Sequence, residues 1–375
     1  MGSGDVSGAL LGGATVYRSI FGQSSSRVES HRLVYRAGVT LRTAPRAAYV
    51  HAREAWRAVR RLGGTEAARL SSRKGRADLA VFHEFEPPPS GGGHQFLSAL
   101  IGELRRRGLD VEVNRLSGAT PVCLFNSFNF DARRLRRFTH DGCRMVHRVD
   151  GPIGVYRGFD DGTDRHVLQL NHDLADATIV QSRFSLDTHR ELELDLRDPT
   201  VILNAVDPAI FHPPERHETA RGRPLRLIAT SWSDNPRKGA DVLAWLDEHL
   251  DWDRFQMTFV GRTPLPLGRI TTVGPVGSEE VANLLRAHDL YIAGSLDDPC
   301  SNAVLEALAC GVPVAYRRSG GHPELVGEGG LPFDECDELP AVLERLSSEI
   351  EQRRAAIRVP SLSETADRYL EVLRG

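Results

Sequence analysis

The feature that most constrains this chain is an alternation of short apolar runs with amphipathic segments, which begins at Asp78. Residues 78–85 (DLAVFHEF) are typical of a buried strand, and residues 94–108 (HQFLSALIGELRRRG) have the apolar spacing of a helix that Gly108 ends. Further strands are predicted at 110–116, 121–128, 143–151, 177–182 and 200–206, and helices at 131–142, 165–175 and from Ser185. Such an order predicts a parallel sheet with helices on both faces.

The alternation stops at residues 207–224, a connector rich in proline and charge, and then starts again. Strands are predicted at 225–230, 255–261, 270–276, 290–295 and 312–317, and helices at 239–250 and, after a serine cap, at 361–375. A chain of 375 residues also exceeds the usual size of one core.

We therefore predict an α/β protein with two Rossmann-like domains facing across a cleft, where such folds bind ligands. Residues 78–206 form the N-terminal domain, 207–355 the C-terminal domain, and 356–375 a helix that crosses back to the N-terminal domain. Residues 1–77 fit neither domain.

These first 77 residues form a basic extension, with 14 Lys and Arg against 4 Asp and Glu, whereas the remaining residues have 33 against 46. The acidic body argues against nucleic-acid binding. A helix is predicted at 45–64, with Tyr49 and Trp56 on one side and arginines over much of the rest. This helix either packs on the body or lies on an anionic membrane surface.

The cysteine spacing and the length of the apolar runs indicate which compartment and which cofactors to expect. The five cysteines have no C-x-x-C spacing, which favours a reduced, cytoplasmic protein without a cysteine metal site. No apolar run approaches 18 residues, so the sequence predicts no membrane span. A peripheral position at the inner membrane surface, through residues 1–77, stays an alternative.

A candidate anion site follows the strand at 225–230, where Arg237 and Lys238 precede a predicted helix. Two cations beside the N–H groups of a helix N-terminus can bind phosphate. The alternative is a solvated charge pair in a loop. Lys238 and Lys74 are the two lysines among 47 basic residues, which favours a specific need for a compact charge at 238.

Residues 295–314 (SLDDPCSNAVLEALACGVPV) hold a second candidate site. Ser301 is a predicted helix cap, and Glu306 lies one turn after Asn302, so both share one side of the helix. A carboxylate at 306 can accept two hydrogen bonds from a vicinal diol such as a ribose. Asp298 can reach hydroxyls of the same ligand, and Asp297 is expected to be a bystander.

Together with the turn GGHPE (320–324), this stretch resembles the signature of the retaining glycosyltransferases of family four, which have the GT-B fold. Further matches lie in order along residues 78–375: PPSGGGHQFL, ADATIVQSRFS, VILNAVDPAIFHP, RKG and FVG…VGPVGSEEVANLLRAHDLYIAGS. The resemblance implies a UDP- or GDP-sugar donor, a hydroxyl acceptor, retention of anomeric configuration and no metal or other cofactor.

Residue roles also follow from the resemblance. It implies that Arg237 and Lys238 neutralise the diphosphate, that Glu306 binds the ribose, and that Asp298 contacts the sugar. The further implied donor contacts are Gly92, Gly93, Pro275, Val276, Ser301 and Asn302, and His147 is implied near the reacting sugar.

The chain departs from the family pattern at three neighbouring positions. Asp298 replaces a longer glutamate, Ser301 a glycine and Cys300 an aromatic residue. These changes bear on the donor, so two alternatives stay open. One is a related enzyme that uses a cyclitol donor, and the other is a scaffold that binds a nucleotide sugar without turnover.

Overall fold

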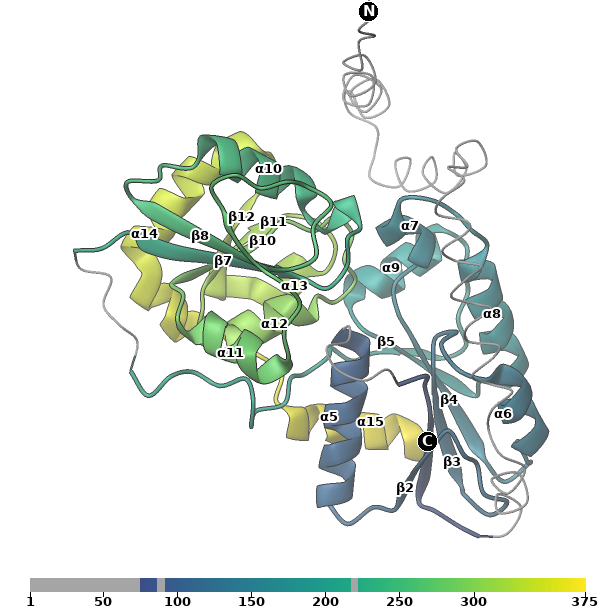
Figure 1. Cartoon of the computed structure of the whole chain (residues 1–375). Helices are drawn as coiled ribbons and strands as arrows, with labels where there is room; N and C mark the ends of the chain where they lie inside the picture. Colours follow the sequence, from purple (N-terminus) through teal and green to yellow (C-terminus); the bar gives the residue numbers. More distant parts are fainter. Residues whose placement is uncertain (1–74, 86–91, 217–221) are drawn as a thin grey trace, which may run out of the picture.

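The computed structural model describes residues 75–85, 92–216 and 222–375. They form two α/β domains side by side, each built on a six-stranded parallel sheet (Figure 1). The predicted pair of Rossmann-like domains is confirmed. Residues 1–74, which include the predicted helix at 45–64 and most of the basic extension, lie outside the described residues.

The N-terminal sheet has the strand order β2-β1-β3-β4-β5-β6. Its strands are β1 (Leu79–Phe82), β2 (Val111–Val113), β3 (Val122–Asn126), β4 (Arg144–Val149), β5 (Ala177–Val180) and β6 (Pro199–Val201). Its helices are α5 (Gly92–Arg106), α6 (Ala132–Phe138), α7 (Ile153–Arg157), α8 (Thr163–Leu174) and α9 (Arg183–Glu191). Strand β6 is shorter than the predicted 200–206, because its pairing with β5 ends at Val201. The interdomain connector therefore begins at Ile202 rather than at the predicted residue 207, and it includes Asn204.

The C-terminal sheet has the order β12-β11-β10-β7-β8-β9. Its strands are β7 (Leu225–Ser231), β8 (Phe255–Gly261), β9 (Thr271–Val273), β10 (Leu290–Ala293), β11 (Val314–Arg317) and β12 (Gly330–Phe333). Its α-helices are α10 (Ala240–His249), α11 (Ser278–Arg286), α12 (Asn302–Ala309), α13 (His322–Val326) and α14 (Leu339–Ala356), with short 3-10 turns η1 (Pro236–Lys238), η2 (Gly327–Gly329) and η3 (Cys336–Glu338).

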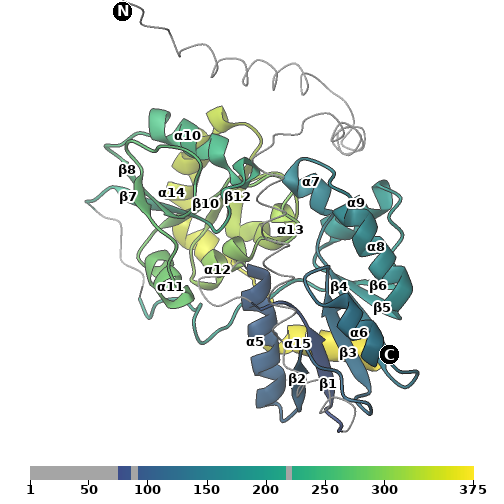
Figure 2. The ribbon, with the colours of Figure 1, turned by 45° about the vertical axis from the view of Figure 1, so that its right-hand side comes forward.

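Side chains that alternate along the strands create a core on each face of each sheet. In β1, Leu79 and Val81 pack against α5, whereas Ala80 and Phe82 belong to the cluster that includes α6 and α8. In β7, Ile228 faces α11 and α12, and Leu227 faces α10 and α14. The two sheets thus lie between helical layers, and this arrangement can be followed in a second view (Figure 2).

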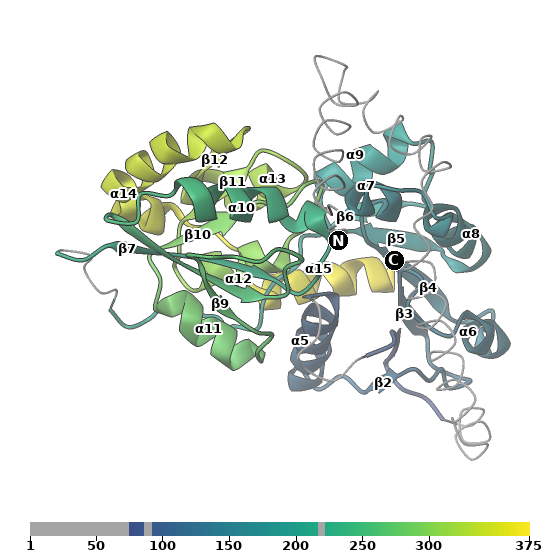
Figure 3. The ribbon, with the colours of Figure 1, turned by 45° about the horizontal axis from the view of Figure 1, so that its top comes forward.

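The last helix, α15 (Leu362–Arg374), crosses back to the N-terminal domain (Figure 3). Ser361 caps it by accepting a hydrogen bond from the Glu364 N–H, and Tyr369 and Leu373 are buried against α5 and β4. The crossing therefore ties the end of the chain to the first sheet.

Beneath this helix lies Arg148, a fully buried arginine on β4. Its guanidinium donates to Tyr369 Oη (3.1 Å), Asn126 Oδ1 (2.6 Å) and Asn204 Oδ1 (2.8 Å), and it lies 5.0 Å from the Phe96 ring centroid. Burial of a cation is costly without such partners. The three bonds join β3, the interdomain connector and α15 at one charge.

The bond from Arg148 to Tyr369 generates a prediction about stability. Tyr369→Phe keeps the ring but leaves Arg148 Nε buried without this acceptor, so we expect the free energy of unfolding to fall by about 1–3 kcal/mol. Urea unfolding followed by fluorescence and circular dichroism measures this. An unchanged unfolding midpoint would show that the bond contributes nothing to the fold.

Candidate active site in the interdomain cleft

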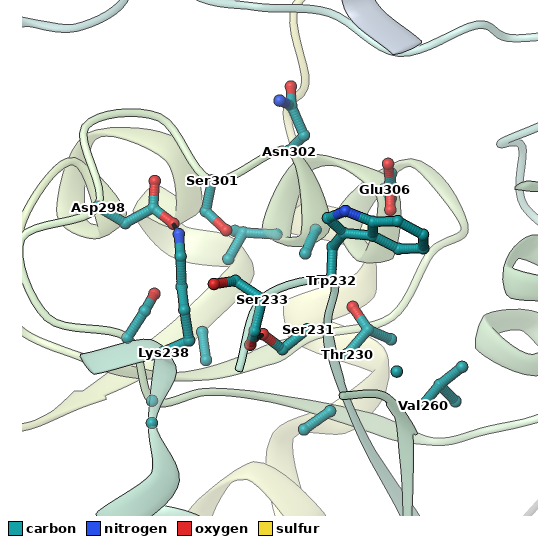
Figure 4. A pocket seen from close by; sticks show the side chains of 18 of the residues that line it. Thr230, Ser231, Trp232, Ser233, Lys238, Val260, Asp298, Ser301, Asn302 and Glu306 are labelled. Carbon is teal, nitrogen blue, oxygen red and sulfur yellow. Dashed lines mark hydrogen bonds and ion pairs between the residues drawn. The ribbon is translucent and has the colours of Figure 1, made fainter. Parts of the chain in front are cut away.

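A pocket of about 390 Å³ lies between the two domains. Gly93, Gln95, Asp150, Tyr156 and Gln181 line it from the N-terminal domain. The C-terminal wall comes from the carboxyl ends of β7 and β10, from residues 275–276 and from the start of α12 (Figure 4). Both the position at the ends of parallel strands and the volume are typical of ligand sites.

Lys238 enters the pocket from the 3-10 turn η1 after β7. Asn235 caps this turn by accepting from the Arg237 N–H, and Gly239 follows in a left-handed conformation (φ 91°). A Cβ on Gly239 would lie 3.0 Å from the backbone of Gly294, so a glycine lets the turn approach β10 closely. The sequence NPRKG therefore fixes where the ammonium group lies.

The Lys238 ammonium lies 2.7 Å from Asp298 Oδ2 and 5.5 Å from the Tyr156 ring centroid. Burial alone would lower the pKa of Lys238, but the charge and hydrogen bond of Asp298 raise it above its ordinary value. In the same way, burial opposes ionisation of Asp298, yet Lys238 and His322 bring the pKa of Asp298 below its ordinary value. Both groups are therefore charged at neutral pH.

The loop that carries Asp298 rests directly on the glycine turn 320–321. The Gly321 N–H donates to Asp298 O (2.8 Å), and a Cβ on Gly320 would lie 2.4 Å from that same oxygen. Gly320 also has a φ of 63°, which side chains disfavour. The paired glycines thus let the backbone of the turn support Asp298.

Helix α12 points its N-terminus at the pocket, which Ser301, Asn302 and Glu306 line together. Ser301 occupies the predicted cap position but makes no side-chain capping hydrogen bond. Asn302 Oδ1 accepts from Asn204 Nδ2 (3.1 Å). The first turn of α12 is thereby linked to the interdomain connector.

Glu306 is a buried carboxyl group, only 8% exposed, on the pocket side of α12. Within the described parts of the chain, no side chain or backbone N–H donates to its carboxyl group, and burial raises the pKa of Glu306 to about 8. Both Glu306 and Trp232 line the pocket, and in Figure 4 they are seen on the side opposite the Lys238–Asp298 pair. One end of the pocket therefore holds the charged Lys238–Asp298 pair. The other end holds a buried carboxyl group that accepts no hydrogen bond from the described residues.

Gly93, Pro275 and Val276 also line the pocket, and Gly92 begins α5 beside Gly93. The structure thus brings most of the predicted donor-binding residues to one cavity. Arg237 and His147 lie elsewhere.

Arg237 is not among the residues that line the pocket. Its Nη2 donates to Asp297 Oδ2, and its Cδ lies 2.8 Å from where a Cβ on Gly158 would stand. Asp297, expected to be a bystander, therefore holds Arg237, and Arg237 packs against the N-terminal domain. Its predicted contact with a diphosphate stays a hypothesis, and the Asp297 contact uses only one nitrogen of the guanidinium.

His147 is fully buried in the N-terminal core and does not line the pocket. Its Nε2–H donates to Ser127 O (2.8 Å), Asn171 donates to Nδ1 (3.2 Å), and the ring stacks on Phe125. Burial lowers the pKa of His147 to about 3. The geometry is that of a neutral core histidine, and the ring does not line the pocket in which the predicted catalytic role would place it.

Several lining residues were not singled out from the sequence. Trp232 follows β7, and the Arg262 guanidinium lies 4.6 Å from its ring centroid. Tyr156 and Gln181 come from the other domain. The position of Trp232 just before NPRKG was an available signal, but nothing local indicated the cross-domain residues.

Neither a metal cluster nor a membrane span is found in residues 75–85, 92–216 and 222–375. No group of three or more His, Cys, Asp or Glu in these ranges could hold a metal ion. No helix there is both long and apolar enough to cross a bilayer.

Sequence comparisons match the C-terminal domain to a known family. Residues 227–349 match the family Glycosyl transferases group 1. A GDP-mannose-dependent alpha-mannosyltransferase of Corynebacterium glutamicum is 28% identical over 191 residues, 46% of this chain and 45% of the relative. One subunit of the human phosphatidylinositol N-acetylglucosaminyltransferase is 28% identical over 145 residues, 34% of this chain and 29% of the relative. The matches thus span less than half of either curated relative.

Solved structures match over both domains. A sucrose-phosphate synthase from Thermosynechococcus elongatus superposes with a TM-score of 0.62 at 16% identity, covering 80% of this chain and 98% of that one. Anabaena HepE in complex with UDP-glucose gives 0.57 at 18% identity, covering 79% and 99%. At such identities the likeness establishes the fold. The chain therefore has the GT-B fold, and its C-terminal domain, at residues 227–349, is a Glycosyl transferases group 1 domain.

Proposed function

We propose that this protein is a glycosyltransferase that moves a sugar from a nucleotide diphosphate sugar to a hydroxyl acceptor, with retention and without a metal. One observation carries the proposal. One interdomain pocket holds a cation beside a helix N-terminus at one end. At the other end it holds the buried Glu306 carboxyl group, which accepts no hydrogen bond from the described residues.

The charged end suits a diphosphate. Lys238 lines the pocket, and the N-terminus of α12 at Ser301 opens onto it without a side-chain cap. Backbone N–H groups and a positive helix end attract phosphate, and a nearby ammonium strengthens the interaction. As the bond to the sugar breaks, these groups would stabilise the charge that develops on the departing diphosphate. Arg237, which is paired with Asp297 and does not line the pocket, would have to turn toward it to join them.

The other end suits a nucleoside. Glu306 would accept hydrogen bonds from the ribose diol, and the base would lie against Pro275 and Val276. The Trp232 indole offers an aromatic surface on the same side of the pocket. The sugar would then lie near Asp298, with the glycines at 92–93 close to the donor and the rest of the N-terminal domain on the acceptor side.

The function is tested by a transfer assay with GDP-mannose and UDP-glucose, donors named for a relative and for a bound neighbour. A thermal-shift screen of nucleoside diphosphates first identifies the base, because ligand binding stabilises the native state. The assay runs with EDTA, since we propose that no metal is needed, and NMR reads the anomeric configuration of the product. Binding without transfer would favour the scaffold alternative. Transfer only when a nucleoside diphosphate cyclitol replaces the sugar donors would favour the enzyme with a cyclitol donor.

Lys238→Ala should lower kcat/KM about 10²- to 10³-fold, because it removes a positive charge from the departing diphosphate. The free energy of unfolding should change less than the activation free energy, since the Lys238 side chain is 27% exposed and the buried Asp298 carboxylate that it leaves can take up a proton. Steady-state kinetics and thermal unfolding measure the two effects.

The matched control is Arg254→Met, which removes an exposed cation paired with Glu344 away from the pocket. It should leave kinetics unchanged. Wild-type kinetics in Lys238→Ala would rule out the assigned role of this lysine.

Donor affinity should rise as pH increases from 6 to 8 and then level off. The free Glu306 carboxyl group has a pKa of about 8, and hydrogen bonds from a diol favour its ionised form, so binding at lower pH must release a proton. Calorimetry in buffers of different ionisation enthalpy detects this proton.

Glu306→Gln isolates this effect, because the nucleotide's own ionisation is the same for both proteins. The variant should bind more weakly at pH 8 and lose the extra proton release. Identical pH profiles for the two proteins would mean that Glu306 does not bind the diol.

A second proposal concerns residues 1–77, whose basic composition favours contact with an anionic membrane surface. We expect the full chain to sediment with phosphatidylserine-containing liposomes, and a chain lacking residues 1–77 to remain in solution. The difference should shrink in high salt. Equal sedimentation of both chains would remove the membrane proposal.

A further inference from the structure

The two walls of the pocket differ in charge. The described N-terminal residues that line it are Gly93, Gln95, Asp150, Tyr156 and Gln181, which supply one carboxylate, two carboxamides and a phenol. Across all described lining residues, Lys238 on the opposite wall is the one Lys, Arg or His. A ligand group beside the N-terminal wall therefore meets a negative charge and neutral polar groups.

Asp150 is held in place through one of its oxygens. Oδ1 accepts from Arg148 Nη1 (3.3 Å) and from Gln181 Nε2. Gln181 is itself fixed, because its Oε1 accepts from Asn204 Nδ2 (2.9 Å). Within the described chain, no hydrogen bond reaches Asp150 Oδ2, and the side chain is 29% exposed. The carboxylate is thus oriented by a buried cation and has an oxygen available.

The position of Asp150 relative to the donor end is fixed by a contact between the domains. A Cβ on Gly151 would lie 2.6 Å from Cβ of Pro299, the residue after Asp298. The backbone after β4 therefore touches the loop that carries Asp298. Asp150 lies at this contact, next to the Lys238–Asp298 end of the pocket.

We propose that Asp150 binds a hydroxyl group of a neutral, polyol-type acceptor such as a monosaccharide unit, and that this wall disfavours acceptors with a phosphate or carboxylate beside the reacting hydroxyl. The inference rests on the proposed function for its donor side. A hydroxyl donates a charge-assisted hydrogen bond to Oδ2, whereas an anion would face the Asp150 charge with no described cation lining that wall.

Calorimetry in the presence of saturating UDP or GDP tests the proposal with two classes of probe. One class is the methyl α-glycosides of mannose and glucose, and the other is the 6-phosphates of the same sugars. The unmodified protein should bind at least one glycoside about tenfold or more tightly than either phosphate. Equal or tighter binding of a phosphate, or no binding of either glycoside, would overturn the proposal.

Asp150→Asn is the matched variant, because its amide oxygen keeps an acceptor for Arg148, while the charge is lost and the available oxygen becomes an N–H donor. It should weaken glycoside binding about tenfold or more, while affinity for the nucleoside diphosphate stays within a factor of about two. Asp173→Asn, which removes an exposed acid on α8, should change neither. Unchanged glycoside binding in Asp150→Asn would contradict the proposal.

Two outcomes separate this inference from the proposed function. Selective glycoside binding without donor consumption would contradict the transferase function and leave the Asp150 site intact. Transfer to a phosphorylated acceptor with wild-type efficiency in Asp150→Asn would support the transferase function and contradict the Asp150 site. If Asp150→Asn fails to fold, the selectivity of the unmodified protein still decides.

Discussion

The buried guanidinium of Arg148 connects three separate segments of this molecule through hydrogen bonds. Arg148 lies inside the N-terminal domain, yet its partners come from β3, from the connector at Asn204 and from the last helix at Tyr369. Asn204 carries the network to Asn302 at the start of α12. A buried cation requires every one of its acceptors, so the crossing helix, the connector and the donor-side helix are positioned by one charge.

The same network orients the chemistry of the cleft. Arg148 and Gln181 hold Asp150 on one wall, and η1 and the 320–321 turn bring Lys238 and Asp298 together on the other. The two carboxyl groups of the C-terminal wall differ because their partners differ. Asp298 is ionised against Lys238, whereas Glu306 has only burial acting on it and holds its proton to about pH 8. An incoming diol can supply the donors that Glu306 lacks.

Much of the fold was predictable because local signals agree with it. The proline-rich connector, the Ser361 cap and every described strand except β12 have a sequence signal, and α15 does cross back to the first domain. Spacing also indicated that Asn302 and Glu306 share one side of α12, and both line the pocket. The pairing of Lys238 with Asp298 depends on two turns 60 residues apart. Only the family resemblance indicated that both residues belong to one site.

The side chains that the sequence did not place depend on packing between distant segments. His147 lies at the carboxyl end of β4, but strand alternation turns it into the core against Phe125 while its neighbour Arg148 faces α15. Tyr156 and Gln181 belong to the pocket only because the domains meet there. Contacts between distant segments leave no pattern in the local sequence from which they could be predicted.

The most direct test of the central claim is a crystal structure with bound UDP or GDP, whichever stabilises the protein. The account predicts a diphosphate between Lys238 and the N-terminus of α12, and both ribose hydroxyls on Glu306. A nucleotide bound outside the interdomain pocket, or bound within it with its ribose away from Glu306 and its phosphates away from Lys238, would contradict the account.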